Sequence, residues 1–282
     1  MTRKIRVAAL VALSACTSAP PPAPSLTAPA TMLAYSMPSP ATATYSYSDS
    51  SRIMIQAGAM GNIQMSSAAT ATTDITYAEK APNLEVTIRV TDFDGRFANS
   101  ATGGRSTVTE SQIEGPAVLS VTPRGATTIT TLPKLSTAVQ SAGLNPGFFR
   151  AFFVQLPAGG VRPGAVWVDT VQSSDNEGGT VVSVDDVVTS TFVRDTVMGG
   201  RTLAVITIAA QRAVNISGSS DGVTIAQRLT GPGTGRVLWD VQRRLLVERS
   251  ESWQLSGSFD LPQMGISGLP VTAHRSGKLE LK

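Results

Sequence analysis

Residues 218–222 have the sequence GSSDG, which fits the G-x-S-x-G spacing around a nucleophilic serine. Asp240, Asp260 and His274 follow in the chain order serine, aspartate, histidine. In that chemistry Ser220 attacks a carbonyl carbon, His274 takes its proton and an aspartate orients the imidazole. The serine must stand on a sharp turn from a strand into a helix, whereas the Val-Thr-Ile that follows is typical of a strand. We therefore expect a polar hairpin turn here, with a Ser220 hydrolase as a third hypothesis.

The composition offers little to metal or cofactor chemistry. The chain has one histidine, His274, and one cysteine, Cys16. A single histidine cannot form a multi-histidine metal site, and a single cysteine excludes an internal disulfide and a cysteine-rich metal site. Asp185 and Asp186 are adjacent in a strand-like stretch, so they point to opposite faces and cannot act as a paired acid and base. We expect no metal, no cofactor and no catalytic residues.

Two glycine-containing segments are predicted to be turns. Residues 92–95 (DFDG) begin like a calcium loop, but Phe97 and Gly103 stand where an EF-hand needs glycine and glutamate. Residues 231–235 (GPGTG) lack the Lys-Ser/Thr pair of a phosphate-binding loop. Each segment is therefore expected to connect two strands.

The first sixteen residues have the features of an export signal. Three basic residues precede a short apolar run, which is too short to span a bilayer, and Leu13-Ser14-Ala15-Cys16 follows. This arrangement resembles the lipobox of bacterial lipoproteins. The resemblance implies that residues 1–15 are removed as a signal peptide. It also implies that Cys16 is acylated, with palmitate-type chains that anchor the protein in a membrane.

The residues after the cysteine bear on location. An aspartate there usually marks retention in the inner membrane, but this chain has Thr17. In a host with two membranes, the resemblance therefore implies a cell-envelope protein on the outer membrane that faces the periplasm. Residues 17–40 hold seven of the 17 prolines among Ala, Ser and Thr, without apolar periodicity. We predict that residues 16–40 are the lipidated cysteine and a disordered tether.

The charge of the mature chain argues against nucleic-acid binding. The sequence has 23 Lys and Arg and 20 Asp and Glu. Removal of the signal peptide takes away Arg3, Lys4 and Arg6, which leaves 20 basic and 20 acidic residues. A net charge of zero gives no general attraction to nucleic acid or to an anionic membrane.

Residues 41–282 alternate apolar and polar side chains, as strands do. The clearest example is residues 84–90, LEVTIRV. Ten to twelve such segments joined by short connections predict a single mostly β (α+β) domain built as an antiparallel meander. We expect the meander to form a curved sheet or an incomplete barrel.

A helical insert is predicted at about residues 134–154. Helical spacing begins at Lys134 and stops at Gly143, and Asn145-Pro146 looks like an N-cap followed by proline at the first helical position. Four of the eight phenylalanines follow, and helical spacing puts them on one face: Phe148, Phe149, Phe152 and Phe153. We expect two short central helices that pack on the concave face of the sheet.

Strands, two helices and strands in this order are similar to bacterial lipoprotein carriers of the LolA, LolB and LppX type. Residues 156–167 also resemble a Leu-Pro…Val-x-x-Gly-x-x-Trp pattern of uncharacterised lipoprotein families. The carrier resemblance implies a lipid held between sheet and helices. The candidate ligand-binding residues are then the aromatic ones: Phe148, Phe149, Phe152, Phe153 and Trp167. A helix that simply fills the core explains the same phenylalanines.

Two hypotheses on function lead. The first is a non-enzymatic cell-envelope lipoprotein of undetermined role that binds a lipid or another apolar ligand between sheet and helices. The second is a structural or assembly partner of an envelope protein complex, for which a free sheet edge or an exposed apolar patch would be the mark.

Overall fold

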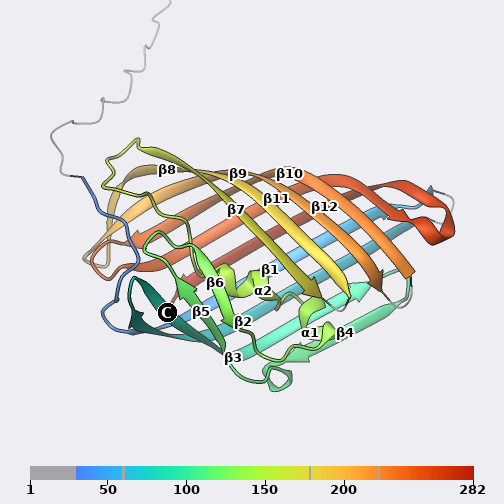
Figure 1. Ribbon diagram of the computed structural model, residues 1–282, viewed down its shortest axis with the longest axis horizontal. Coiled ribbons are helices and arrows are strands. Elements are labelled where there is room, and N and C mark those ends of the chain that lie inside the picture. Colours follow the sequence, from blue (N-terminus) through green and yellow to red (C-terminus); the bar gives the residue numbers. More distant parts are fainter. Residues whose placement is uncertain (1–29, 59–60, 178, 221–222) are drawn as a thin grey trace, which may run out of the picture.

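The computed structural model describes residues 30–58, 61–177, 179–220 and 223–282 (Figure 1). These residues form one antiparallel sheet of twelve strands, and two short helices lie between β6 and β7 in the chain. The sheet is curled and open along one side, as half of a barrel would be. The prediction of a mostly β fold with a curved antiparallel sheet is confirmed.

The elements in chain order are β1 (Thr42–Gln56), β2 (Asn62–Lys80), β3 (Asn83–Asn99), β4 (Gly104–Thr109), η2 (Glu110–Gln112), β5 (Ala117–Val121), β6 (Thr127–Thr131), α1 (Thr137–Ser141), α2 (Pro146–Arg150), β7 (Val166–Glu177), β8 (Thr180–Met198), β9 (Arg201–Ser220), β10 (Val223–Asp240), β11 (Leu245–Leu261), η3 (Pro262–Met264) and β12 (Ile266–Leu281).

The sheet is built outward from a central pair. Its order is β6-β5-β3-β2-β1-β12-β11-β10-β9-β8-β7, and β4 pairs with β3 off this path. The first and last strands pair along their length, from Tyr45 with Leu281 to Ile55 with Val271. The two edges, β6 and β7, are consecutive in the chain. The segment that contains α1 and α2 therefore links one edge of the sheet to the other.

Alternation along the strands buries one face of the sheet more completely than the other, which has only a small buried cluster. Tyr45 and Tyr47 of β1 are buried, and so are Leu84, Val86 and Ile88 of β3. The residues between them are half-buried or exposed. The register aligns these side chains in rows that cross the strands. For example, Tyr47 pairs with an alanine of β2, and this alanine pairs with a phenylalanine of β3. We call this side the buried face.

Two predicted turns lie inside strands instead. Residues 92–95 belong to β3 and residues 231–235 belong to β10. A side chain at Gly233 would collide with the ring of Trp253, which lies against β10 at that point. A Cβ at Gly95 would come within 2.5 Å of an aromatic ring. These glycines allow a ring to approach the backbone closely, and composition alone does not distinguish that role from a chain reversal.

The helices are present but shorter than the predicted insert. Asn145 caps α2 through its side chain, which accepts a hydrogen bond from a backbone N–H of the first turn, and Pro146 is the first helical residue, as predicted. The helix ends at Arg150. Phe152 and Phe153 therefore lie in the chain after α2 and not on its face, because only one and a half turns form.

The packed domain begins earlier than the expected boundary at residue 41. Thr31 forms a backbone bridge with Val161, and Leu33 and Tyr35 are buried in the main core. Their burial joins the described part of this proline-rich stretch to the main core. The signal peptide, Cys16 and the first part of the tether lie outside the described residues.

Candidate functional site

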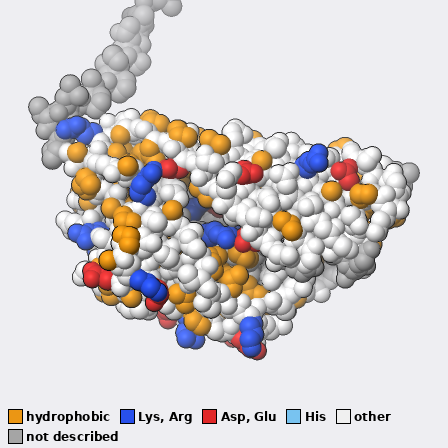
Figure 2. Space-filling view, in the orientation of Figure 1, with side chains coloured by type: hydrophobic (Ala, Val, Ile, Leu, Met, Phe, Trp, Pro, Cys, Tyr) orange, Lys and Arg blue, Asp and Glu red, His pale blue; other side chains and the backbone are white. Residues whose placement is uncertain are grey.

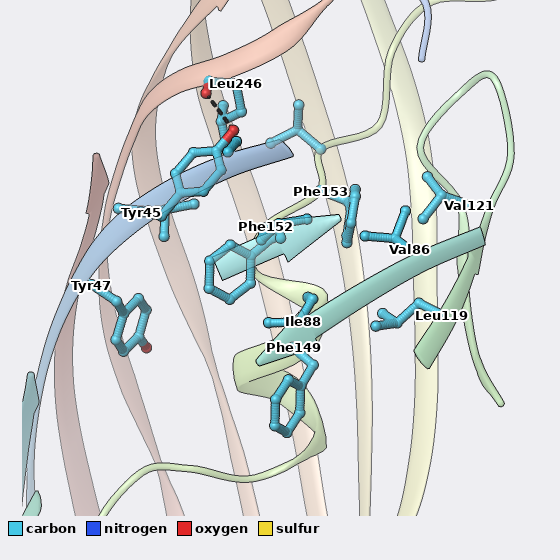
Figure 3. Close-up of a cluster of buried hydrophobic side chains, with 14 of the residues drawn as sticks. Tyr45, Tyr47, Val86, Ile88, Leu119, Val121, Phe149, Phe152, Phe153 and Leu246 are labelled. Carbon is cyan, nitrogen blue, oxygen red and sulfur yellow. Dashed lines mark hydrogen bonds between the residues drawn. The ribbon is translucent and has the colours of Figure 1, made fainter. Parts of the chain in front are cut away.

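The predicted aromatic residues come together in the main core (Figure 3). Phe148 and Phe149 are 0% exposed, and Phe152 and Phe153 are almost as buried. Phe148 packs edge-on against Tyr47 of β1, with ring centres 4.7 Å apart. The cluster therefore joins the helical insert to the centre of the sheet. A contact between these rings and a ligand stays a prediction.

Trp167, the fifth predicted residue, lies on β7 and is half-buried. It packs against the main cluster, and its indole N–H donates to the backbone carbonyl of Gln155 at 3.1 Å. It therefore ties the edge strand to the chain that follows α2.

Buried tyrosines fix the same cluster by hydrogen bonds. The hydroxyl of Tyr45 donates to the carbonyl of Leu246 at 2.8 Å, and the hydroxyl of Tyr35 accepts from the backbone N–H of Val154 at 2.9 Å. Burial raises the pKa of both tyrosines well above the ordinary value. Both phenols therefore stay neutral and act as hydrogen-bonding groups within the core.

Arginines tie the insert to the sheet. Arg249 of β11 donates to the carbonyls of Ala151 at 2.9 Å and Phe153 at 3.1 Å, just after α2. Arg150 of α2 forms two hydrogen bonds with the carboxylate of Asp175 on β7, at 2.8 and 3.1 Å. Bidentate pairs of this kind set orientation as well as contact. The end of α2 is therefore held from two different strands.

A band of charged side chains crosses the buried face beside the insert. Arg212 makes two bonds of 2.7 Å to Asp186, and Arg275 donates to Asp49 at 2.8 Å. The guanidinium carbon of Arg212 also lies 3.7 Å from the ring centre of Trp253. We call the following six residues the charged belt: Asp49, Asp186, Arg212, Arg249, Glu251 and Arg275.

Glu251 lies among the arginines of the belt. Burial by itself raises the pKa of this carboxyl, but Arg249, Arg275 and Arg212 outweigh it and lower the pKa to about 2. Arg249 contributes most, since it also donates to the carboxylate at 2.7 Å. Glu251 is therefore charged at every physiological pH, and it balances positive charge that burial would otherwise disfavour.

A second apolar cluster lies on the buried face, beyond the belt. Its members all come from strands: Ile53, Ile55, Ile63, Met65, Val214, Leu229, Leu255, Phe259, Leu269, Val271 and Ala273. Only Ile55, Leu229 and Val271 are buried, and the other eight are partly exposed. We call this cluster the open-end wall. Sequence reasoning missed it, because it appears only when the register aligns apolar positions of strands far apart in the chain.

The two sheet edges face each other across a recess of about 460 Å³. Residues 127–132 line one side, residues 172–175 line the other, and Arg150 also borders it. The lining residues are consecutive, which indicates that strand edges and not strand faces form the walls. Figure 2 shows a hollow near these edges, with Lys or Arg and hydrophobic side chains in it. The four predicted phenylalanines do not line this recess.

The register does not bring the predicted serine and histidine together. Ser220 pairs with Val223 where β9 and β10 form a hairpin, as expected for that segment. His274 is exposed in the middle of β12. The line of paired residues that passes through His274 and crosses β11 and β10 reaches β9 close to Gln211. About nine residues along β9, roughly 30 Å, separate Gln211 from Ser220. A catalytic base must stand within hydrogen-bond reach of its nucleophile.

In the described part of the chain, no group of three or more His, Cys, Asp or Glu side chains is placed to hold a metal ion. No helix among the described residues is long and apolar enough to cross a membrane. No protein-family model matches the chain, and no curated protein matches its sequence. The geometry above is therefore the basis for a functional assignment.

Proposed function

We propose that this chain is a cell-envelope lipoprotein that binds a lipid or another apolar ligand on the buried face of its half-barrel. The open-end wall carries the proposal. Its apolar side chains come from six neighbouring strands, β1, β2, β9, β10, β11 and β12, yet most of them remain partly exposed. Contiguous, partly exposed apolar surface on a curled sheet is typical of a site that takes up an apolar ligand.

In this proposal the buried face is the concave face, and α1 and α2 pack against one end of it. The ligand occupies the remaining space, between the insert and the open-end wall. The phenylalanines of the insert are at most 5% exposed, so in this proposal they close one end of that space from within the core, and direct contact of a ligand with them or with Trp167 stays a prediction. The gap between β6 and β7 is the natural route of entry, because the sheet is not closed there.

The lipid anchor belongs to the same proposal. Acylation at Cys16 and the proline-rich tether would keep the domain near a membrane, which is the main source of apolar ligands in the envelope. The outer membrane, with the domain in the periplasm, is the location that the residues after Cys16 favour.

Dye binding tests the site. The full mature chain with Cys16→Ser needs no detergent, and N-phenyl-1-naphthylamine fluoresces when it enters apolar surroundings. We expect Leu255→Asp to weaken dye binding at least roughly tenfold, because it puts a charge into the open-end wall. Gln254→Asp is the matched control, since Gln254 is exposed on the opposite face of the same strand.

Both variants are checked by thermal unfolding, so that loss of binding is not confused with loss of the fold. Lipid in a native mass spectrum of the purified lipoprotein would support the assignment independently. A wild-type chain that neither carries lipid nor binds the dye contradicts the proposal, and so does equal binding by the two variants.

A structural partner role is the second candidate, and the free edge strand favours it. β7 ends the sheet, and Val166 and Val168 on it are 59% and 60% exposed. Exposed valines beside an unpaired edge suit addition of a strand from another protein. A pull-down of the lipoprotein from membranes would then yield a partner protein. Val168→Lys should lose this partner. The control Thr230→Lys, at an exposed position of β10, should retain it.

A further inference from the structure

We propose that the ligand is an amphiphile with an anionic head group, whose acyl chain lies along the open-end wall and whose head group reaches Trp253 and Arg212. This inference rests on the proposed function and names the class of molecule that the site takes. A purely apolar ligand would use the wall alone, whereas an amphiphile uses the wall and the charged belt together.

The belt and the wall follow one another in the same order on three neighbouring strands. On β11, Glu251 and Trp253 precede Leu255 on the buried face. On β12, Arg275 pairs with Trp253, and Ala273 pairs with Leu255. On β1, Asp49 precedes the two isoleucines of the wall. The buried face therefore changes from polar to apolar along the strand direction, which is the pattern of an amphiphile.

The length of the wall matches one acyl chain. Along β11 the wall runs from Leu255 to Phe259, four residue steps or roughly 13 Å at the rise of a strand. One leaflet of a bilayer holds its acyl chains in half of a hydrocarbon core of about 30 Å, so a chain there takes up about 15 Å. A chain that lies parallel to the strands would cover the wall, and its head group would then reach the belt.

Unused hydrogen-bond donors at the belt indicate the chemistry of the head group. Trp253 is 5% exposed, and its indole N–H has no partner among the described residues. The Nε of Arg249 is also buried without a partner in the described part of the chain. Both groups donate and neither accepts, so each lacks an acceptor atom, which the head group of the proposed ligand would supply. Carboxylate and phosphate oxygens accept most strongly, and the guanidinium of Arg212, although paired with Asp186, lies directly over the ring of Trp253 as a further donor group.

The ion pairs of the belt do not account for Trp253. Each guanidinium already has a carboxylate: Arg212 has Asp186, Arg275 has Asp49 and Arg249 has Glu251. The indole N–H takes part in none of these pairs. Trp253→Phe therefore removes that donor while it keeps an aromatic ring against Gly233 and below Arg212.

Displacement of bound N-phenyl-1-naphthylamine provides the test, again with the full mature chain carrying Cys16→Ser. The two competitors are lysophosphatidylglycerol and monoacylglycerol with the same 16-carbon chain, each below its micelle-forming concentration. We expect the anionic lipid to compete at least roughly tenfold better, which is about 1.4 kcal/mol.

Two variants locate the head group. Trp253→Phe should lower the affinity for the anionic lipid several-fold and leave the neutral lipid unchanged. Arg212→Gln combined with Asp186→Asn, which removes a charge pair without leaving one partner alone, should bring the two affinities close together. Arg236→Gln, at an exposed position of β10, should change neither.

The outcomes separate this inference from the proposed function. Equal competition by the two lipids against a dye that binds the wall would overturn the inference and leave the apolar site in place. An unchanged affinity of Trp253→Phe for the anionic lipid would also overturn it. Absence of any dye binding by the wild-type chain would remove the site itself.

Discussion

At the residue scale, Glu251 is the group through which pH acts on the charged belt. Burial opposes its ionisation, and three arginines more than compensate for that, so that the pKa falls from the ordinary 4.5 to about 2. Protonation of the carboxyl would leave Arg249 without its anionic partner in a site that is only partly open to water. Protonation would cost more free energy in the folded state than in the unfolded chain, because the unfolded chain does not hold these groups together.

A pH series of urea unfolding measures this contribution. A carboxyl with a lowered pKa in the folded state stabilises fully above its ordinary pKa of 4.5 and loses the effect as the pH falls through about 2. Relative to Glu251→Gln, the wild-type chain should lose up to about 3 kcal/mol of unfolding free energy between pH 6 and pH 2. Parallel curves for the two proteins would show that Glu251 does not couple to the arginines.

Individual residues also show which features the sequence predicts, the local ones, and which it does not, the long-range contacts. The strand alternation of residues 84–90 and the cap at Asn145 are local patterns, and the structure confirms both. The ion pair of Arg275 with Asp49 joins positions 226 residues apart. Its formation depends on the register of β1 with β12, which no local pattern encodes. The belt and the open-end wall were missed for this reason, although the residue types that form them are visible in the sequence.

At the element scale, the insert with α1 and α2 is the least self-sufficient part of the fold. Each helix has five residues, too few to be stable without tertiary contacts. Its order depends on the cap at Asn145, on the buried phenylalanines, on Arg249 of β11, which donates to the insert, and on Arg150 of α2, which bonds to β7. The predicted helical stretch was too long because a phenylalanine spacing of three and four residues suits a helix, while packing stops this one at Arg150.

Removing the cap of α2 should weaken the insert. Asn145→Ala leaves a backbone N–H of the first turn without its side-chain acceptor, and we expect a loss of about 1 kcal/mol in the free energy of unfolding. Asn145→Ser keeps an acceptor and should lie within a few tenths of the wild type. Hydrogen exchange of residues 146–153 reports the same change locally. An alanine variant as stable and as protected as the serine variant would show that packing alone holds the helix.

At the scale of the whole molecule, the proposed anchor at Cys16 would decide where the half-barrel works. We expect wild-type Cys16 to incorporate labelled palmitate and the protein to fractionate with membranes. Cys16→Ser should remove the label and release the chain. Thr17→Asp is the matched control, since it should keep the label and move the protein to the inner membrane. A Cys16→Ser chain that behaves as the wild type does would refute the lipoprotein assignment.

The pairing of β1 with β12 has a consequence for biogenesis. The middle of the sheet joins the two ends of the domain, so it cannot assemble until the last strand has been synthesised. A chain that emerges N-terminus first would present β1 as a long unpaired edge of fifteen residues during that interval. Contacts this distant also close slowly. The nascent domain should therefore depend on a holding chaperone during that interval, and under the proposed export this chaperone would act after translocation.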